Sequence, residues 1–179
     1  MDTDAFWALI DEARAAAPAD SPDWDAFEAV AERATALLAV RPREDILAFQ
    51  QIFWNLMGAS FREPLWGAAY TINGGCSDDG FDYFRGWLIG QGRATYESAV
   101  ADPDSLAGHP VVQAAAKNCD LWNESMLGVA SAAYRTAFGE EPPRGSYTIT
   151  YPDPGPGWDF DDEEENRRHI PRLSELYAG

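Results

Sequence analysis

Apolar residues recur three or four positions apart over the first 139 residues, and Pro and Gly interrupt this pattern at short intervals. Such spacing places the apolar side chains along one side of each helix, which predicts short amphipathic helices packed around a shared core. The interruptions limit each segment, because Pro disrupts a helix interior and Gly favours helix ends. The helices are expected at residues 4–17, from residue 22 to the break at 41–42, and at residues 43–59, 64–72, 79–88, 93–100, 110–116 and 120–138.

The composition changes at Glu140, after which Pro and Gly are frequent up to residue 157. Residues 146–151, with the sequence SYTITY, favour an extended conformation but have no obvious partner strand. We therefore predict a mainly α, single-domain bundle of about seven to eight helices, with residues 1–139 as the helical body. Residues 140–179 are expected to form an irregular C-terminal arm packed on the same domain, with at most a short strand or hairpin and a short helix at residues 172–177.

The chain has 179 residues, of which 46% are apolar, so one domain can bury a core of its own. No run approaches the roughly 18 consecutive apolar residues of a membrane-spanning helix. The N-terminus lacks a basic segment followed by an apolar stretch, so we expect no secretory signal and a cytoplasmic location. Cys76 and Cys119 belong to no disulfide framework, which agrees with a reducing compartment.

Acidic residues outnumber basic ones by 30 to 13, which gives a formal net charge of -17. This balance disfavours nucleic acid and anionic membranes as partners, because both are bound mainly through Lys and Arg. A protein partner with a basic surface, a cation, or no charge-driven partner remains, since a high net charge also keeps proteins soluble.

Residues 65–96 combine polar, aromatic and glycine residues without a simple amphipathic pattern, and this segment is the first place to look for a site. Trp158 is added because it lies between Gly157 and a run of acidic residues, where it can anchor the arm to the body or to a partner. The candidate binding residues are Trp66, Tyr70, Asn73, Cys76, Asp78, Asp79, Asp82, Arg85, Arg93 and Trp158.

Cys76 precedes the start of a predicted helix, whose partial positive charge lowers a thiol pKa and favours a nucleophilic thiolate. Asp78 and Asp79 act in the opposite direction, and the only two histidines, His109 and His169, are distant in sequence. A buried, unreactive thiol is therefore the simpler interpretation of Cys76.

Carboxylates suggest metal sites at Asp78, Asp79 and Asp82 and in the acidic run at residues 159–165, but neither group matches a defined calcium loop. Helix capping explains the first group, and a solvated charge run explains the second. The Cys and His residues lack zinc-ligand spacing, and the glycines form no phosphate-binding loop. We therefore predict no metal site and no cofactor.

Arg85 and Arg93 flank an apolar helix face in an otherwise acidic protein, and either guanidinium can bind a carboxylate or phosphate through two hydrogen bonds. The alternative for both is an internal salt bridge to Asp78, Asp82 or Glu97. The large number of acidic residues favours this alternative.

Four stretches of the chain together resemble one family. They read FWALIDEAR near the start, LWGAAYTINGGCSDDGFDYFRGWLIGQGR in the middle, ADPDSLA after it and WDFDDEEE near the end. These stretches resemble the bacterial domain-of-unknown-function 4240 family. The resemblance implies a self-contained bacterial domain and assigns no catalytic residue.

Two functions of different classes follow from these features. The first is a non-enzymatic protein-interaction or regulatory module whose acidic surface and arm bind a protein partner with a basic surface. The alternative is a small hydrolase-type enzyme that uses residues 73–93 and a divalent cation. Nucleic-acid mimicry ranks third, because it needs carboxylates spaced like phosphates, and the oligomeric state stays open.

Overall fold

The computed structural model describes residues 1–17, 24–116 and 120–178. Within these ranges the chain forms ten α-helices and one 3-10 helix, eight of them with seven or more residues, and no β-strand. The prediction of a mainly α single domain is confirmed. No helix in the described ranges is both long enough and apolar enough to cross a membrane. The expected helix start at residue 22 and Cys119 lie outside the described residues.

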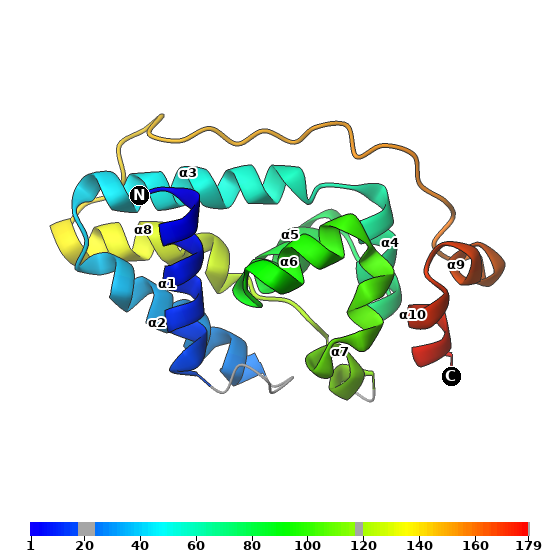
Figure 1. The fold of residues 1–179 in the computed structure, drawn as a ribbon. Helices are drawn as coiled ribbons and strands as arrows, with labels where there is room; N and C mark the ends of the chain where they lie inside the picture. Colours follow the sequence, from blue (N-terminus) through cyan, green and yellow to red (C-terminus); the bar gives the residue numbers. More distant parts are fainter. Residues whose placement is uncertain (18–23, 117–119, 179) are drawn as a thin grey trace.

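Four helices form one half of the body. α2 packs against α1 and α8, and α8 also contacts α3 (Figure 1). Their apolar stripes meet in the core, where the ring centroids of Phe6 and Phe49 are 4.5 Å apart. These helices are α1 (Thr3–Ala15), α2 (Trp24–Ala39), α3 (Arg43–Ala59) and α8 (Ser125–Phe138).

Shorter elements form the other half, arranged around one buried helix. That helix is α5, which contacts α2, α3, α4, α6 and α8. All of its residues from Phe84 to Gly90 are buried, which explains why the sequence of this segment shows no amphipathic pattern. The elements are α4 (Glu63–Asn73), α5 (Asp78–Gly90), α6 (Arg93–Ala101), the 3-10 helix η1 (Pro103–Gly108) and α7 (Pro110–Ala115).

The predicted helix at residues 120–138 starts later than expected, at Ser125. Residues 120–124 are not helical, because their backbone groups bind other parts of the fold. The amide of Leu121 donates to Asn73 Oδ1 over 2.9 Å, and the amide of Asn123 donates to the carbonyl of Tyr83 over 2.9 Å. The Asn123 side chain then accepts a hydrogen bond from the amide of Met126, inside the first turn of α8.

The C-terminal arm leaves α8 at Gly139, whose left-handed conformation ends the helix (φ 71°). It then runs along α3 without regular structure to the far end of the molecule (Figure 1). There α9 (Glu163–His169) and α10 (Pro171–Leu176) form two short helical turns, and α10 contacts α4 and η1.

The short helix expected at residues 172–177 corresponds to α10, whereas α9 was not expected. Its signal was present in the sequence as charge rather than as apolar spacing. Asp162 caps the helix by accepting from the amides of Glu164 and Glu165, and three acidic residues occupy the first turn. Basic residues occupy the last turn, an arrangement that complements the helix dipole.

Candidate functional site

The candidate residues are distributed over α4, the turn that follows it, α5, the start of α6 and the arm. The structure brings Trp66, Cys76, Asp82 and Arg85 into one cluster around the α4–α5 turn. Gly74, in the left-handed conformation, ends α4 and allows this turn (φ 64°). The remaining candidates lie in separate environments.

Arg85 lies in the middle of the cluster, and its side chain is fully buried. Its Nε donates to the carbonyl of Phe81 over 3.3 Å. One terminal nitrogen donates to the carbonyl of Met57, and the other forms an ion pair with the carboxylate of Asp82. These contacts correspond to the internal alternative considered for Arg85, because they direct its guanidinium to groups within the protein.

Aromatic rings enclose the same guanidinium. Its central carbon lies 4.6 Å from the ring centroid of Phe81, 5.0 Å from that of Phe61 and 5.3 Å from that of Tyr151. Burial lowers the pKa of Arg85, and the charge of Asp82 opposes this effect. Because an arginine pKa starts so high, the guanidinium stays charged at neutral pH.

Cys76 lies at the edge of this cluster, in the turn between α4 and α5, and it is half-buried. Its carbonyl accepts a hydrogen bond from Nε1 of Trp66 over 2.9 Å. Burial raises the pKa of the Cys76 thiol to about 12, although the charge of Arg85 and a contact with Trp66 act in the opposite direction. The thiol is therefore protonated at neutral pH, which makes it a poor nucleophile.

Asp78 and Asp79 are exposed in the first turn of α5. The N-cap of α5 is Ser77, and its hydroxyl accepts from the amide of Gly80 over 3.1 Å. Acidic residues in a first turn stabilise a helix through its dipole. Within the described ranges, no group of three or more His, Cys, Asp or Glu side chains is placed to hold a metal ion.

Trp158 joins the arm to the body rather than projecting into solvent. Its ring packs against Gly67 of α4, where an added Cβ would lie only 2.5 Å from the ring. The indole Nε1 donates to Asn166 Oδ1 over 2.7 Å, and the ring stacks on His169 at a centroid distance of 4.3 Å. Nearby, the hydroxyl of Tyr70 donates to Asp161 over 2.6 Å, which fixes a second point of the arm.

Arg93 and Asn73 hold other elements together. Arg93 forms ion pairs of 2.7 Å with Glu97 in its own helix and with Asp4 of α1, and all three side chains are exposed. Asn73 exchanges two hydrogen bonds with the backbone of Leu121, at 2.9 and 3.2 Å. Both arrangements support the fold directly.

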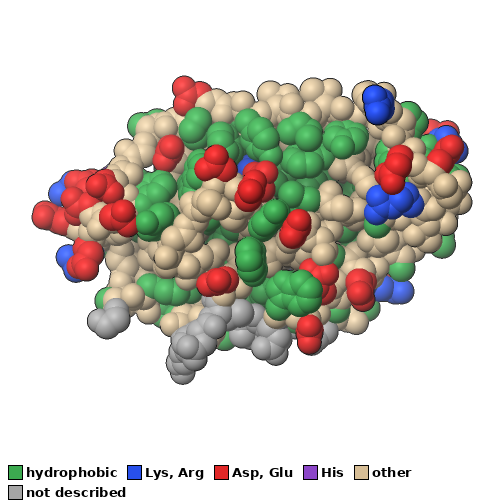
Figure 2. Space-filling view, turned by 180° about the vertical axis from the view of Figure 1, so that it is seen from behind, with side chains coloured by type: hydrophobic (Ala, Val, Ile, Leu, Met, Phe, Trp, Pro, Cys, Tyr) green, Lys and Arg blue, Asp and Glu red, His purple; other side chains and the backbone are tan. Residues whose placement is uncertain are grey.

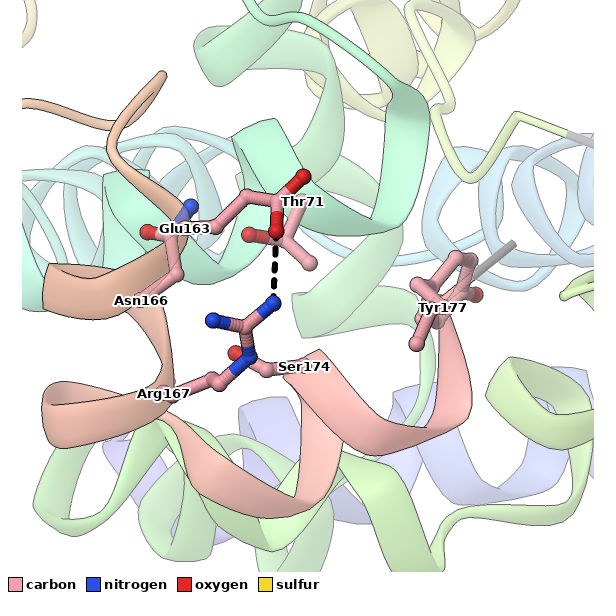
Figure 3. A pocket seen from close by; sticks show the side chains of 7 residues that line it. Thr71, Glu163, Asn166, Arg167, Ser174 and Tyr177 are labelled. Atoms are coloured by element: carbon pink, nitrogen blue, oxygen red, sulfur yellow. Dashed lines mark hydrogen bonds and ion pairs between the residues drawn. The ribbon is translucent and has the colours of Figure 1, made fainter.

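A pocket that contains none of the candidate residues lies between α4, α9 and α10 (Figure 3). Its volume is about 260 Å³, which is below the usual range of small-molecule sites. Arg167 and Glu163 form an ion pair of 2.5 Å across it, so their charges offset each other. The sequence could not indicate this pocket, because Thr71 and Ser174 meet there only through packing of the arm.

A further surface not selected from the sequence is formed by Tyr83 of α5 and Trp122, and we call it the Tyr83–Trp122 surface. The two ring centroids are 6.0 Å apart, and 43% of the Trp122 surface is exposed. Partial burial raises the pKa of Tyr83, as do the negative charges of Glu124, Asp79 and Asp82. Aromatic rings and carboxylates therefore occur side by side on this surface.

Hydrophobic and acidic side chains also alternate over a larger area of the molecule. Figure 2 shows one face on which hydrophobic side chains gather over the centre, with acidic side chains between and around them. Most of the basic side chains visible in this view lie towards its two ends.

The comparisons with known proteins give one match. A family model described as a protein of unknown function (DUF4240) matches residues 1–136. No curated protein and no solved structure matches the chain. The family resemblance seen in the sequence is confirmed, and the matched part ends before the C-terminal arm.

Proposed function

The chain belongs to the DUF4240 family of proteins of unknown function, and we propose that it is a non-enzymatic protein-interaction module that binds a basic segment of a partner protein. The observation that carries this proposal is the Tyr83–Trp122 surface. Two partly exposed aromatic rings lie there next to the exposed carboxylates of Asp79 and Glu124.

This combination suits Arg and Lys side chains. A guanidinium or ammonium group can lie over an aromatic face while its charge pairs with a neighbouring carboxylate. Trp and Tyr are also the residues that most often dominate binding energy at protein interfaces. The formal net charge of -17 adds long-range attraction, which speeds the encounter with a basic partner.

The hydrolase alternative has less support from the geometry. The Cys76 thiol has a pKa raised to about 12, so little thiolate exists at neutral pH. The guanidinium of Arg85 is buried and directed to internal partners, so it does not offer its fork to a substrate. We further propose a cytoplasmic partner, because the half-buried free thiol of Cys76 fits a reducing compartment.

The test uses a fluorescein-labelled peptide of alternating Arg and Ser, with the matching Glu and Ser peptide as a control. Fluorescence anisotropy at physiological ionic strength reports binding under conditions that screen long-range attraction. We expect Trp122→Ala to weaken binding of the Arg peptide by about tenfold or more. Phe138→Ala, which removes a 38% exposed aromatic ring at the opposite end of α8, should leave the affinity unchanged.

A second pair of variants separates a local surface from overall charge. Glu124→Gln removes a carboxylate beside Tyr83, whereas Glu12→Gln removes an exposed carboxylate of α1. The proposal requires the first variant to bind the Arg peptide more weakly than the second. Equal losses in the two variants, or no binding of the Arg peptide by the unmodified chain, would overturn it.

A further inference from the structure

Residues 146–157 of the arm, which we call the strap, follow α3 across the molecule without regular secondary structure (Figure 1). None of the strap residues is buried, and many are exposed. The strap is thus held from one side only, like a bound peptide, and adds no side chain to the buried core.

The strap's backbone is recognised by groups of the body. The side-chain amide of Gln51 accepts from the amide of Thr148 over 2.8 Å and donates to the carbonyl of the same residue over 3.1 Å. It thereby replaces the pair of hydrogen bonds that a neighbouring strand would make. Further along, the amide of Glu63 donates to the carbonyl of Pro154 over 3.0 Å. Such backbone contacts are a general means of binding extended peptides.

Two tyrosines, four positions apart, anchor the strap through their rings. Tyr147 stacks on Trp54 with a centroid distance of 6.5 Å and an interplanar angle of 4°. Tyr151 packs against Phe61 at 5.0 Å, and its hydroxyl donates to Asp82 over 3.1 Å. The body therefore presents two aromatic contact points with a fixed separation.

Gly58 of α3 permits the close approach between these two points. A Cβ at this position would lie 2.6 Å from the carbonyl oxygen of Thr150, and the other atoms within 4 Å also belong to the strap. Glycine inside a helix is unfavourable by about 1 kcal/mol relative to alanine. At position 58 the absence of a side chain leaves room for the strap backbone at Thr150.

The body and the strap also differ in their relation to the family. Gln51, Trp54, Gly58, Phe61 and Glu63 all lie within the part matched by the family model, whereas the strap lies outside it. The residues of the body that contact the strap thus belong to the part of the chain that the family model matches.

We propose that these five residues, which we call the strap groove, form a binding site for an extended, proline-containing segment of a partner protein with two aromatic residues four positions apart. The strap is its intramolecular ligand, and the partner segment binds when the strap leaves. This inference goes beyond the proposed function, because it concerns another surface and another partner chemistry.

Release of the strap does not require the body to unfold. The Tyr151 ring lies over the guanidinium of Arg85, but no strap side chain belongs to the apolar core. α10 keeps its own anchor, since Ile170 and Leu173 are buried. Weakly packed segments open with less free energy than the whole fold. A tethered ligand nevertheless has an effective concentration in the millimolar range, so the strap suppresses binding of free peptides.

The experiment uses the full chain with Tyr147→Ala and Tyr151→Ala, which removes both anchors from the strap and leaves the groove intact. The probe is a fluorescein-labelled peptide with the sequence of residues 145–157. Anisotropy should show binding at least about tenfold tighter to this variant than to the unmodified chain. The same peptide with both tyrosines replaced by alanine should not bind.

Gly58→Ala, added to the double variant, tests the location, because the three atoms nearest to a Cβ there all belong to the strap. Circular dichroism confirms that each variant stays folded. The proposal fails if the double variant does not bind the peptide, or if Gly58→Ala leaves binding unchanged. It also fails if light scattering shows that the unmodified chain is a dimer and that the peptide converts it to a monomer. In that case the strap of a second copy, rather than a partner protein, would occupy the strap groove. Trp122→Ala should not affect this assay, so its outcome is independent of the proposed function.

Discussion

At the scale of single residues, burial decides what the candidate side chains can do. Arg85 and Arg93 looked equivalent in the sequence, since each has an acidic residue at helical spacing, Asp82 three positions before Arg85 and Glu97 four positions after Arg93. The structure separates them, because Arg85 is fully buried with an internal network, whereas Arg93 pairs with exposed carboxylates. Sequence spacing identifies the partners of a charge but cannot show whether water reaches them.

Arg85→Leu should therefore destabilise the protein strongly. It leaves the Asp82 carboxylate and the Met57 carbonyl without their partner, and breaking a buried pair in this way costs about 3–5 kcal/mol. Arg93→Leu is the matched control and should cost less than about 1 kcal/mol, because its ion pairs are exposed. Urea denaturation measures both, and similar losses in the two variants would contradict this account.

Cys76 should make the free energy of unfolding decrease at alkaline pH. Its folded pKa of about 12 lies above the value of about 8.5 for an unfolded thiol, so the folded state holds the proton more tightly. This contribution is complete below about pH 8.5 and is lost as the pH rises towards 12. The free energy of unfolding should thus fall more steeply above pH 8.5 in the unmodified chain than in Cys76→Ser, and parallel curves would contradict the raised pKa.

At the scale of helices and connections, most elements could be predicted from apolar spacing and from Pro and Gly. α5 was located correctly, but its central position was not evident, because its part from Phe84 to Gly90 is buried on all sides and has no amphipathic pattern. The later start of α8 depends on hydrogen bonds from residues 121 and 123 to distant groups, which no local pattern encodes. Apart from Trp158, the candidate residues came from one chain segment, whereas the Tyr83–Trp122 surface combines two separate segments.

Two glycines in helices should respond in opposite ways to alanine. At Gly86 of α5, an added Cβ would lie 2.7 Å from the carbonyl oxygen of Asn123, so Gly86→Ala must displace the segment before α8. Such overpacking typically costs about 1–3 kcal/mol. At Gly128 of α8 nothing lies within 4 Å, so Gly128→Ala should stabilise the protein by up to about 1 kcal/mol. Thermal unfolding followed by circular dichroism compares the two, and a stabilising Gly86→Ala would rule out the close approach.

At the scale of the whole molecule, the chain is a helical body to which the C-terminal segment is attached at separate points. The last anchor is Asp104 of η1, only 6% exposed, which accepts hydrogen bonds from the amides of Arg172 and Leu173 and from the Arg172 side chain. One buried carboxylate thus satisfies the first amides of α10, which have no partner within the helix.

Asp104→Ala should therefore loosen α9 and α10 while the body stays folded. The expected result is faster hydrogen exchange at residues 163–176 than in the unmodified protein, measured by mass spectrometry. Asp102→Ala provides the control, because Asp102 contacts the same Arg172 through an exposed ion pair of 3.0 Å. Equal protection of α10 in Asp104→Ala and in the unmodified chain would show that apolar packing alone holds it.

The one-sided attachment of the strap has a consequence for the order of folding. Gln51 and Thr148 are 97 positions apart, yet the end of α8 already lies beside α3 once the body has formed. The loop that closes when the strap binds is then only the segment between the end of α8 and Thr148. The entropic cost of binding the strap therefore depends on the length of this segment and not on all 97 positions. The body can consequently form early from contacts among its helices, and the stacking of Tyr147 on Trp54 becomes a signal of the final step.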